Sequence, residues 1–271
     1  MRYAILFSGV WLAVSCAPVV DREKPVIKRP ESPATAVLAP PSHPVEVPQV
    51  VIGVFSGLEF EGVAFDSRTH RLVVVDQSEG PGSRFADAGA VGSSLGGLAV
   101  VNGGFFTPEG GPLGLVVSTG KRSGSWNSTT SLGSGIWHSD VSGASAISRR
   151  EKLGRVGAAA MRELLQAGPM LVENRRAVGG LDAEKTSART MILWDGGSRW
   201  WIGCSSPATL AETAGTLART PVPGWPVRHA LNLDGGRSSD LWISAAVQGG
   251  PLVRRPPWNR PVRNFLVLVP R

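Results

Sequence analysis

The residues best suited to chemistry lie in one stretch, residues 229–242, where a short apolar run gives way to polar residues and glycines. These residues are Asn232, Asp234, Gly235, Gly236, Arg237, Ser238 and Ser239. Two consecutive glycines permit positive φ and let a ligand approach the backbone closely. A carboxylate, a cation and two hydroxyls beside free backbone N–H groups suit an anionic or polyhydroxylated ligand. The alternative is a tight Asp-Gly turn between two strands of a hairpin.

A second segment has the same form. The apolar run 98–101 predicts a buried strand, and it leads directly into Asn102, Gly103, Gly104 and Phe105. A single strand that ends in a polar residue and two glycines is most simply a turn. Two such segments in one chain favour a shared ligand site.

Other chemistries lack their signatures. The four histidines have no metal-ligand spacing. The chain contains no phosphate loop or dinucleotide fingerprint. Asp234 with Asp240 is a conceivable cation site, but lone carboxylates are more often solvated. The sequence therefore predicts neither a metal nor a cofactor.

The elements that must position these residues belong to a turn-rich globular domain. The chain has 271 residues, of which 42% are hydrophobic and 18% are charged, with 34 glycines and 21 prolines. This composition predicts one sizeable core, many turns and few long helices. The formal net charge is +7, but the arginines are scattered in pairs without a nucleic-acid-binding motif. We expect no nucleic-acid partner, and we interpret the basic surface as one that faces anionic envelope material.

The hydrophobic pattern of residues 50–271 predicts a single α+β domain of many strands and a few short helices. Strands are expected at 98–101, 114–118, 170–172, 229–233 and 265–269, with one hairpin formed by 61–65 and 71–76 and another by 191–194 and 199–202. Helices are expected near 85–91, from Val156 to a stop at Gly168-Pro169, and from an N-cap at Ser206-Pro207 through 210–218. Cys204 is predicted to be a small buried hydrophobe.

The N-terminal segment predicts export. Residues 1–15 have a minimal basic start and an apolar stretch too short to span a membrane, which is typical of a signal peptide. Ala13-Val14-Ser15-Cys16 resembles a bacterial lipobox, in which Cys16 carries lipid, and an ordinary signal peptide is the alternative. Residues 16–49 read as a Pro-rich linker, and Ala17 favours the outer membrane. We expect a bacterial envelope lipoprotein that contacts the membrane through its lipid only.

The motifs, in this order, resemble those of the phosphodiester glycosidase family. The matching segments are 100–106, 112–115, 167–172, 188–190, 231–239 and 262–264, which together cover roughly residues 60 to 270. The combination of Asn-Gly-Gly-Phe-Phe with a later Asp-Gly-Gly-x-Ser-Ser is specific. The resemblance implies an exported bacterial hydrolase that removes an N-acetylhexosamine-like sugar from a phosphodiester linkage on an envelope or extracellular glycan.

The resemblance also suggests roles for individual residues. Hydrolysis at the anomeric carbon builds an oxocarbenium-like transition state, and a phosphate leaving group is already a weak base. Asp234 is the expected base or nucleophile, Arg189 is expected to clamp the phosphate, and Thr190 to donate to it. A structural ion pair is the alternative for Arg189. The expected substrate-binding residues are Asn102, Gly103, Gly104, Phe105, Asn232, Gly235, Gly236, Arg237, Ser238 and Ser239. The two asparagines suit sugar hydroxyls or an acetamido group, and turn or helix capping is the alternative for the two serines.

The chain departs from the family pattern at two places. Arg237 stands where a third glycine is usual, and Lys185-Thr186-Ser187 lacks the His or Pro often found before Ala188. The Arg237 side chain either contacts the substrate or blocks the pocket. The alternative function is therefore a catalytically inactive envelope lipoprotein that binds glycan or phosphoglycan.

Overall fold

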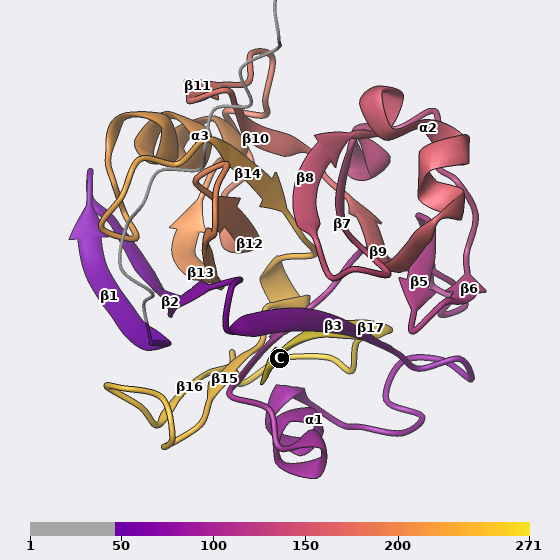
Figure 1. Cartoon of the computed structure of the whole chain (residues 1–271). Coiled ribbons are helices and arrows are strands. Elements are labelled where there is room, and N and C mark those ends of the chain that lie inside the picture. The colour runs from indigo at the N-terminus through magenta and orange to yellow at the C-terminus, as the bar shows by residue number, and fades with distance from the viewer. Residues whose placement is uncertain (1–46) are drawn as a thin grey trace, which may run out of the picture. The chain divides into compact units, whose positions relative to one another are not determined.

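Three antiparallel sheets and three short helices make up the part of the chain that a computed structural model describes, residues 47–271 (Figure 1). This is the mixed α+β domain that the sequence predicts. The predicted signal peptide, Cys16 and nearly all of the predicted linker lie outside the described residues. No helix within residues 47–271 is long and apolar enough to cross a membrane.

The first sheet has seven strands. Their order is β1 (Gln49–Phe55), β2 (Leu58–Asp66), β13 (Arg199–Ala208), β12 (Ser187–Trp194), β14 (His229–Asn232), β10 (Met170–Glu173) and β11 (Arg176–Ala177). The predicted hairpin of 191–194 and 199–202 is confirmed as part of β12 and β13, whose register pairs Trp194 with Trp200. The predicted strands at 170–172 and 229–233 are confirmed as β10 and β14.

The other two sheets have five strands each. One has the order β16 (Leu252–Arg254), β15 (Leu241–Ile243), β4 (Ala99–Asn102), β17 (Asn264–Pro270) and β3 (His70–Asp76). The other has the order β6 (Lys121–Ser123), β5 (Val116–Ser118), β9 (Met161–Ala167), β7 (Gly135–Asp140) and β8 (Ser145–Arg149). The predicted strands at 98–101, 114–118 and 265–269 are confirmed as β4, β5 and β17.

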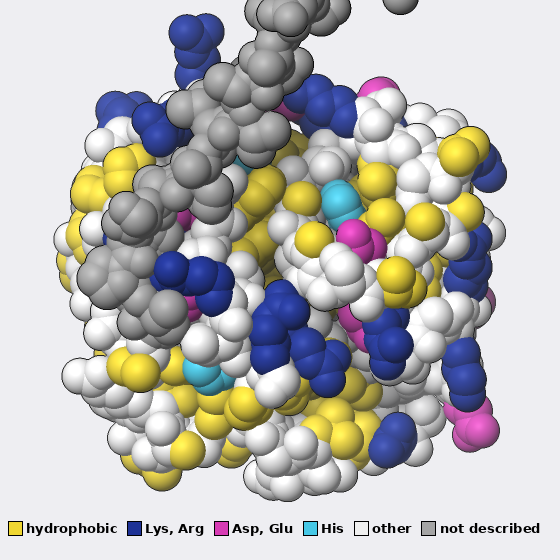
Figure 2. All heavy atoms as spheres, viewed as in Figure 1, with side chains coloured by type: hydrophobic (Ala, Val, Ile, Leu, Met, Phe, Trp, Pro, Cys, Tyr) yellow, Lys and Arg dark blue, Asp and Glu magenta, His cyan; other side chains and the backbone are white. Residues whose placement is uncertain are grey.

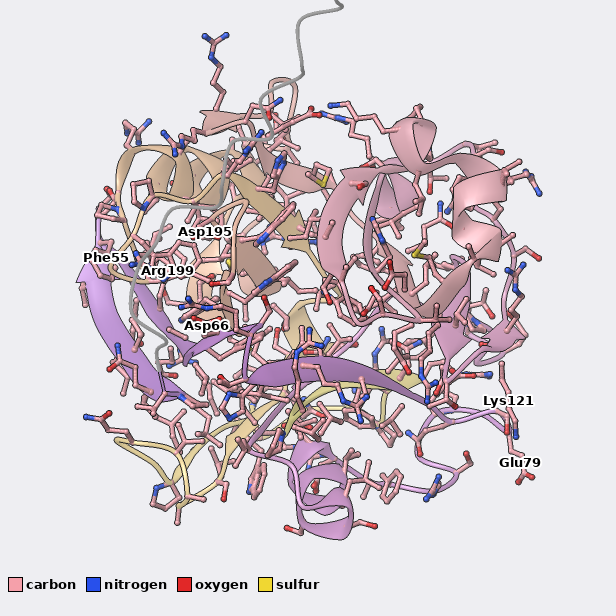
Figure 3. All side chains as sticks on the ribbon, in the orientation of Figure 1. Phe55, Asp66, Glu79, Lys121, Asp195 and Arg199 are labelled. Atoms are coloured by element: carbon pink, nitrogen blue, oxygen red, sulfur yellow. The ribbon has the colours of Figure 1, made fainter. Side chains whose placement is uncertain are left out.

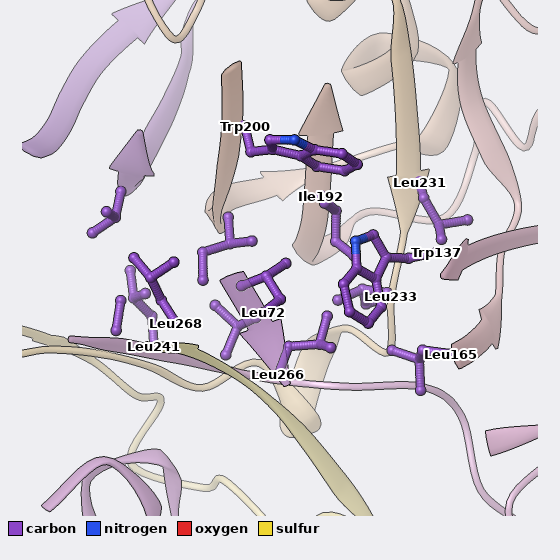
Figure 4. Close-up of a cluster of buried hydrophobic side chains, with 14 of the residues drawn as sticks. Leu72, Trp137, Leu165, Ile192, Trp200, Leu231, Leu233, Leu241, Leu266 and Leu268 are labelled. Carbon is purple, nitrogen blue, oxygen red and sulfur yellow. The ribbon is translucent and has the colours of Figure 1, made fainter. Parts of the chain in front are cut away.

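The main hydrophobic core lies where the three sheets face one another (Figure 4). Successive residues of a strand point to opposite faces of its sheet. On β13, Trp200, Ile202 and Cys204 therefore enter this core, whereas Trp201 enters a second cluster on the other face. Cys204 is a buried free thiol, as predicted.

Each sheet has a helix on its outer face. The helices are α1 (Ala88–Leu95) on the β4 sheet, α2 (Arg150–Ala159) on the β9 sheet and α3 (Leu210–Arg219) on the seven-stranded sheet. The helix α3 begins with a capping box, in which Glu212 N–H donates to Thr209 Oγ1 over 3.1 Å and Thr209 N–H donates to Glu212 Oε2 over 2.9 Å. The predicted N-cap at Ser206-Pro207 is wrong because β13 continues to Ala208.

Two further predictions about elements are wrong. The segments 61–65 and 71–76 are both strands, but they do not form a hairpin, because β2 pairs with β1 and β13 whereas β3 pairs with β17. The chain changes sheets at Asp66, whose Oδ1 accepts a 2.8 Å hydrogen bond from Arg68 N–H. Figure 3 shows Asp66, Asp195 and Arg199 together at the ends of the strands that meet here.

The predicted helix from Val156 to Gly168 is instead the end of α2 followed by β9. Leu164 packs on the α2 side of the sheet and Leu165 packs in the main core, so β9 is buried on both faces. A strand buried on both faces loses its alternating pattern and is easily taken for a helix. The helix predicted near 85–91 is α1, displaced by a few residues because its N-cap is Asp87.

Candidate active site

Asp234 lies just beyond the end of β14, in a turn that crosses between two sheets. β14 belongs to the seven-stranded sheet and β15 to the β4 sheet, so the alternative of a hairpin turn is wrong. The glycines allow the close packing of this turn. A Cβ on Gly235 would lie 2.5 Å from Ala188 O, and Gly236 has φ near 60°.

The two Gly-Gly segments lie side by side, as the sequence predicts for a shared site. Asn102 Nδ2 donates to Asp234 O over 2.7 Å, and Asp234 N–H donates to Gly103 O over 3.0 Å. Gly104 N–H donates to the buried Asn264 side chain, and Gly103 leaves no room for a Cβ beside it. The turn that carries Asp234 is therefore fixed by the end of β4 and the start of β17.

A cavity of about 340 Å³ opens beside this turn. Its lining residues are Phe105, Leu132, Pro169, Asp182, Lys185, Ser187, Arg189, Leu210, Asn232, Asp234 and Gly235. Two carboxylates and two cations therefore face a space with several apolar walls. Lys185 and Ser187 belong to the segment where the chain departs from the family pattern, so that departure lies in the wall of the cavity.

Asp234 is the most buried charged group of the cavity, with 9% of its side chain exposed. Burial raises the pKa of its carboxyl above the ordinary value. Three donors oppose this rise: the Ser238 hydroxyl, Gly235 N–H at 2.9 Å from Oδ1, and Arg260, whose Nη2 is 3.5 Å from Oδ2. The result is a carboxylate held in one orientation at the cavity wall.

Arg260 is a member of this site that sequence reasoning missed. Its guanidinium lies over the Phe106 ring, 4.6 Å from the centroid, and its Nε donates to Ser238 Oγ over 3.0 Å. It lies in an irregular loop after β16, in a stretch rich in Arg and Pro, where no pattern distinguishes it from its neighbours. Only the folded arrangement brings it to Asp234.

Arg189 lies in the cavity wall, as expected of a phosphate-binding residue. Its Nε donates to Ala208 O over 2.9 Å, and its Nη2 donates to Lys185 O over 2.7 Å. No ion pair joins it to a carboxylate within residues 47–271, so the alternative of a structural ion pair is not what the structure contains. Two backbone carbonyls hold the charged group in place at the cavity.

Asn232 lines the cavity and is held by hydrogen bonds to the backbone. Its Nδ2 donates to Gly168 O over 2.9 Å and to Leu233 O over 2.8 Å, which fixes the orientation of the amide. Its Oδ1 is buried and has no hydrogen-bond partner in the described part of the chain. A buried acceptor without a partner is costly.

Several predicted site residues are buried beneath the turn and do not line the cavity. Thr190 is fully buried, and its hydroxyl donates to Asn102 Oδ1 over 2.8 Å and lies 3.2 Å from Ser239 Oγ. Asn102 Oδ1 also accepts from Asp240 N–H. With Ser238, these side chains support Asp234 from below. Thr190 therefore has no free route to a phosphate.

Arg237 is exposed and does not line the cavity. Its Nε donates to Trp258 O over 3.2 Å, and its own carbonyl accepts from Arg260 N–H. The residue thus fastens the loop that carries Arg260. No group of three or more His, Cys, Asp or Glu side chains arranged to hold a metal occurs between residues 47 and 271.

Solved structures of other proteins share this fold. One is the catalytic domain of zebrafish N-acetylglucosamine-1-phosphodiester alpha-N-acetylglucosaminidase, auto-inhibited by its pro-peptide, with a TM-score of 0.58 and 17% identity over 85% of each chain. A hypothetical protein from Synechocystis has a TM-score of 0.53 and 17% identity, over 85% of this chain and 64% of that one. A putative exported protein from Burkholderia pseudomallei has a TM-score of 0.52 and 16% identity, over 79% of this chain and 75% of that one.

These likenesses define the class of the fold, an α+β domain built on three sheets. No curated protein sequence matches the chain significantly. The family model for phosphodiester glycosidases matches residues 96–269, a span that contains both turns, Arg189, Asp234 and Arg260. The chain therefore belongs to the phosphodiester glycosidase family, as its motifs predict.

Proposed function

We propose that the protein is a hydrolase that releases an N-acetylhexosamine-like sugar from a phosphodiester at its anomeric carbon. The observation that carries the proposal is the buried Asp234 carboxylate in a cavity that also presents Arg189 and Lys185. One orientated carboxylate beside two cations suits a substrate that is neutral at the sugar and anionic at the leaving group. The name of the zebrafish protein describes the same reaction class.

Asp234 supplies the group that acts at the anomeric carbon. As a base it removes a proton from water while the water oxygen bonds to the anomeric carbon, and the C–O bond to phosphate breaks with its electron pair on oxygen. As a nucleophile it forms a glycosyl ester that water then hydrolyses. Inversion or retention in the released sugar distinguishes the two routes.

Arg189 and Lys185 are proposed to bind the departing phosphate. The backbone carbonyls of Ala208 and Lys185 already orient Arg189, so little side-chain freedom is lost when it binds a phosphate oxygen. Asp182, the other carboxylate of the wall, accepts hydrogen bonds from Glu184 N–H and Lys185 N–H, which lower its pKa. An ionised Asp182 is no general acid, and a phosphate monoester leaves without one.

The sugar is proposed to occupy the part of the cavity between Asn232 and the apolar wall. Asn232 lines this part of the cavity, and its amide suits an acetamido group or a sugar hydroxyl. Phe105 supplies a ring surface for the sugar. Thr190, Asn102, Ser238 and Ser239 act as positioning residues below the turn.

The reaction class is tested with two substrates that share the sugar. The purified protein should release free sugar from an N-acetylhexosamine 1-phosphodiester and act far more slowly on an aryl N-acetylhexosaminide, which lacks the phosphate. Arg189→Ala should raise KM and lower kcat for the diester, because the guanidinium binds phosphate in both ground and transition states. Equal rates on both substrates would contradict the proposed class.

The alternative function, an inactive glycan-binding protein, requires the Arg237 side chain to block the cavity. The exposed position of Arg237 outside the cavity does not favour that reading. Arg237→Gly distinguishes the two functions. If the parent is inactive and Arg237→Gly hydrolyses the diester, Arg237 blocks the site and the natural protein is a binding protein.

We also propose that the protein is exported and held at the bacterial outer membrane by lipid on Cys16. The support is the lipobox-like sequence at residues 13–16 and the Pro-rich stretch after it. The Burkholderia structure that shares the fold belongs to a putative exported protein. Cys16→Ser should move the protein from the detergent fraction to the soluble fraction, and equal partition of both forms would contradict the anchor.

A further inference from the structure

A second cavity lies at the opposite end of β9 from Asp234. It has a volume of about 270 Å³, and Arg71 of β3, Arg162 of β9 and Arg271 after β17 line it. The other end of β9 leads to Gly168, whose carbonyl accepts from Asn232 in the candidate active site. At ~3.3 Å per extended residue, Arg162 and Gly168 are about 20 Å apart. The arginine cavity is therefore a separate site.

The three arginines reach the cavity from separate elements, and Arg71 and Arg162 both lie within electrostatic range of the Glu163 carboxylate. Arg271 is fixed, because its Nε donates to Ser67 O over 2.6 Å and its Nη2 donates to Gly143 O over 2.7 Å. No hydrogen bond or ion pair joins the Arg71 or Arg162 side chain to another residue of 47–271. Figure 2 shows Lys and Arg side chains gathered over β3 and the C-terminal end of the chain.

The two carboxylates of the cavity, Asp140 and Glu163, accept hydrogen bonds from neighbouring groups of the protein. Asp140 Oδ1 accepts from Ser142 N–H at 2.8 Å, from Ser142 Oγ at 2.6 Å and from Ala144 N–H at 3.1 Å. Glu163 accepts from Val74 N–H at 2.9 Å and from Thr119 N–H at 3.0 Å. Arg162 and Arg71 act on Glu163 through their charge but form no hydrogen bond with it in the described chain, so their N–H groups remain available to an external anion.

We propose that this cavity binds a phosphate-bearing anion. A guanidinium presents paired N–H donors that match the oxygens of phosphate. A multiply charged phosphate group can accept from several guanidiniums at once. The cavity volume of about 270 Å³ accommodates more than one phosphoryl group. The ligand is either a small phosphate compound or a phosphate-containing polymer.

Calorimetric titration of the purified full chain tests this site with two probes, inorganic pyrophosphate and linear polyphosphate. Arg71→Gln and Arg162→Gln should each weaken binding by about tenfold, the loss expected for a charge-assisted hydrogen bond of ~1.4 kcal/mol or more. Arg176→Gln removes an exposed guanidinium on β11 and should leave the affinity unchanged. If pyrophosphate saturates the site, the ligand is a small phosphate compound. If only polyphosphate saturates the site, the ligand is a phosphate-containing polymer.

The proposed function and this site are tested independently. Arg189→Gln changes the candidate active site and should leave binding at the arginine cavity intact. Arg71→Gln and Arg162→Gln should leave turnover of a small diester intact. Because Arg162 is exposed, its variant stays folded even if the half-buried Arg71 variant does not, and a thermal melt shows this. Binding of neither probe, or equal affinities in Arg162→Gln and Arg176→Gln, would overturn the proposal.

Discussion

Asp234 combines two properties that act against each other. Burial favours its protonated form, whereas Gly235 N–H, the Ser238 hydroxyl and Arg260 favour its ionised form. The net effect raises its pKa. A base or nucleophile must be ionised to act, so the activity of the protein should fall as pH drops through this raised pKa.

The pH dependence of kcat/KM tests the role of Arg260. Arg260→Gln removes a positive charge that lowers the pKa of Asp234, so the acid limb should move to higher pH. Arg176→Gln, which removes a distant exposed guanidinium, should leave the limb in place. The measurement is the pH profile of diester hydrolysis. An unshifted limb in Arg260→Gln would show that Arg260 does not tune the carboxyl.

The stability of Asp234→Asn should exceed that of the parent at pH 7. The pKa of Asp234 is higher in the folded protein than in the unfolded chain, so the folded state binds the proton more tightly and ionisation costs stability as pH rises. Asn has the same size and no charge. The Arg260 side chain is half-exposed, so water solvates its charge and the loss of the Asp234 carboxylate costs little stability.

Thermal melts of Asp234→Asn, the parent and the exposed control Glu184→Gln check this. The difference between Asp234→Asn and the parent should shrink as pH falls toward the unfolded pKa of ~3.9. A lower melting temperature for Asp234→Asn at pH 7 would mean that the hydrogen bonds to the carboxylate outweigh its burial.

Four elements are joined below the turn by one buried amide. Asn102, at the end of β4, donates to Asp234 O after β14 and accepts from Thr190 of β12 and from Asp240 N–H before β15. A buried network with each member satisfied holds its elements in one arrangement. The position of Asp234 is therefore set by strands from two sheets.

Thr190→Val tests this network because valine keeps the shape and removes the hydroxyl. We expect the free energy of unfolding to fall by about 1–2 kcal/mol, since Asn102 Oδ1 loses a buried donor. kcat should fall more than KM changes, because Thr190 orients Asp234 and does not touch substrate. Thr186→Val, at an exposed position, is the control. Denaturant unfolding and steady-state kinetics measure both effects, and a change confined to KM would contradict the positioning role.

The sequence predicts the site better than it predicts the elements around it. A polar residue and two glycines at the end of a strand form a local signal in the sequence. The two segments that carry this signal are hydrogen-bonded to each other in the structure. β9 is misread as a helix because it is buried on both faces, which depends on α2 and the main core. Arg260 and the buried role of Thr190 depend on contacts between distant segments, which local patterns do not contain.

At the scale of the whole molecule, the three sheets share one core and leave both cavities at their margins. The Pro-rich residues before Val47 have little apolar surface to bury. We therefore expect the domain from about residue 50 onward to fold alone. Limited proteolysis should leave a stable fragment whose N-terminus lies between Pro41 and Gly53. A stable fragment that begins near Ala17 would contradict this boundary.

The most direct test of the central claim is the rate of sugar release from an N-acetylhexosamine 1-phosphodiester by the parent, Asp234→Asn and Glu184→Gln, without added metal. The parent and the Glu184→Gln control should turn over alike. Asp234→Asn should still bind the diester but lose roughly 10²–10⁴-fold in kcat. Full activity in Asp234→Asn would refute the mechanism, because no other buried carboxylate lines this cavity among residues 47–271.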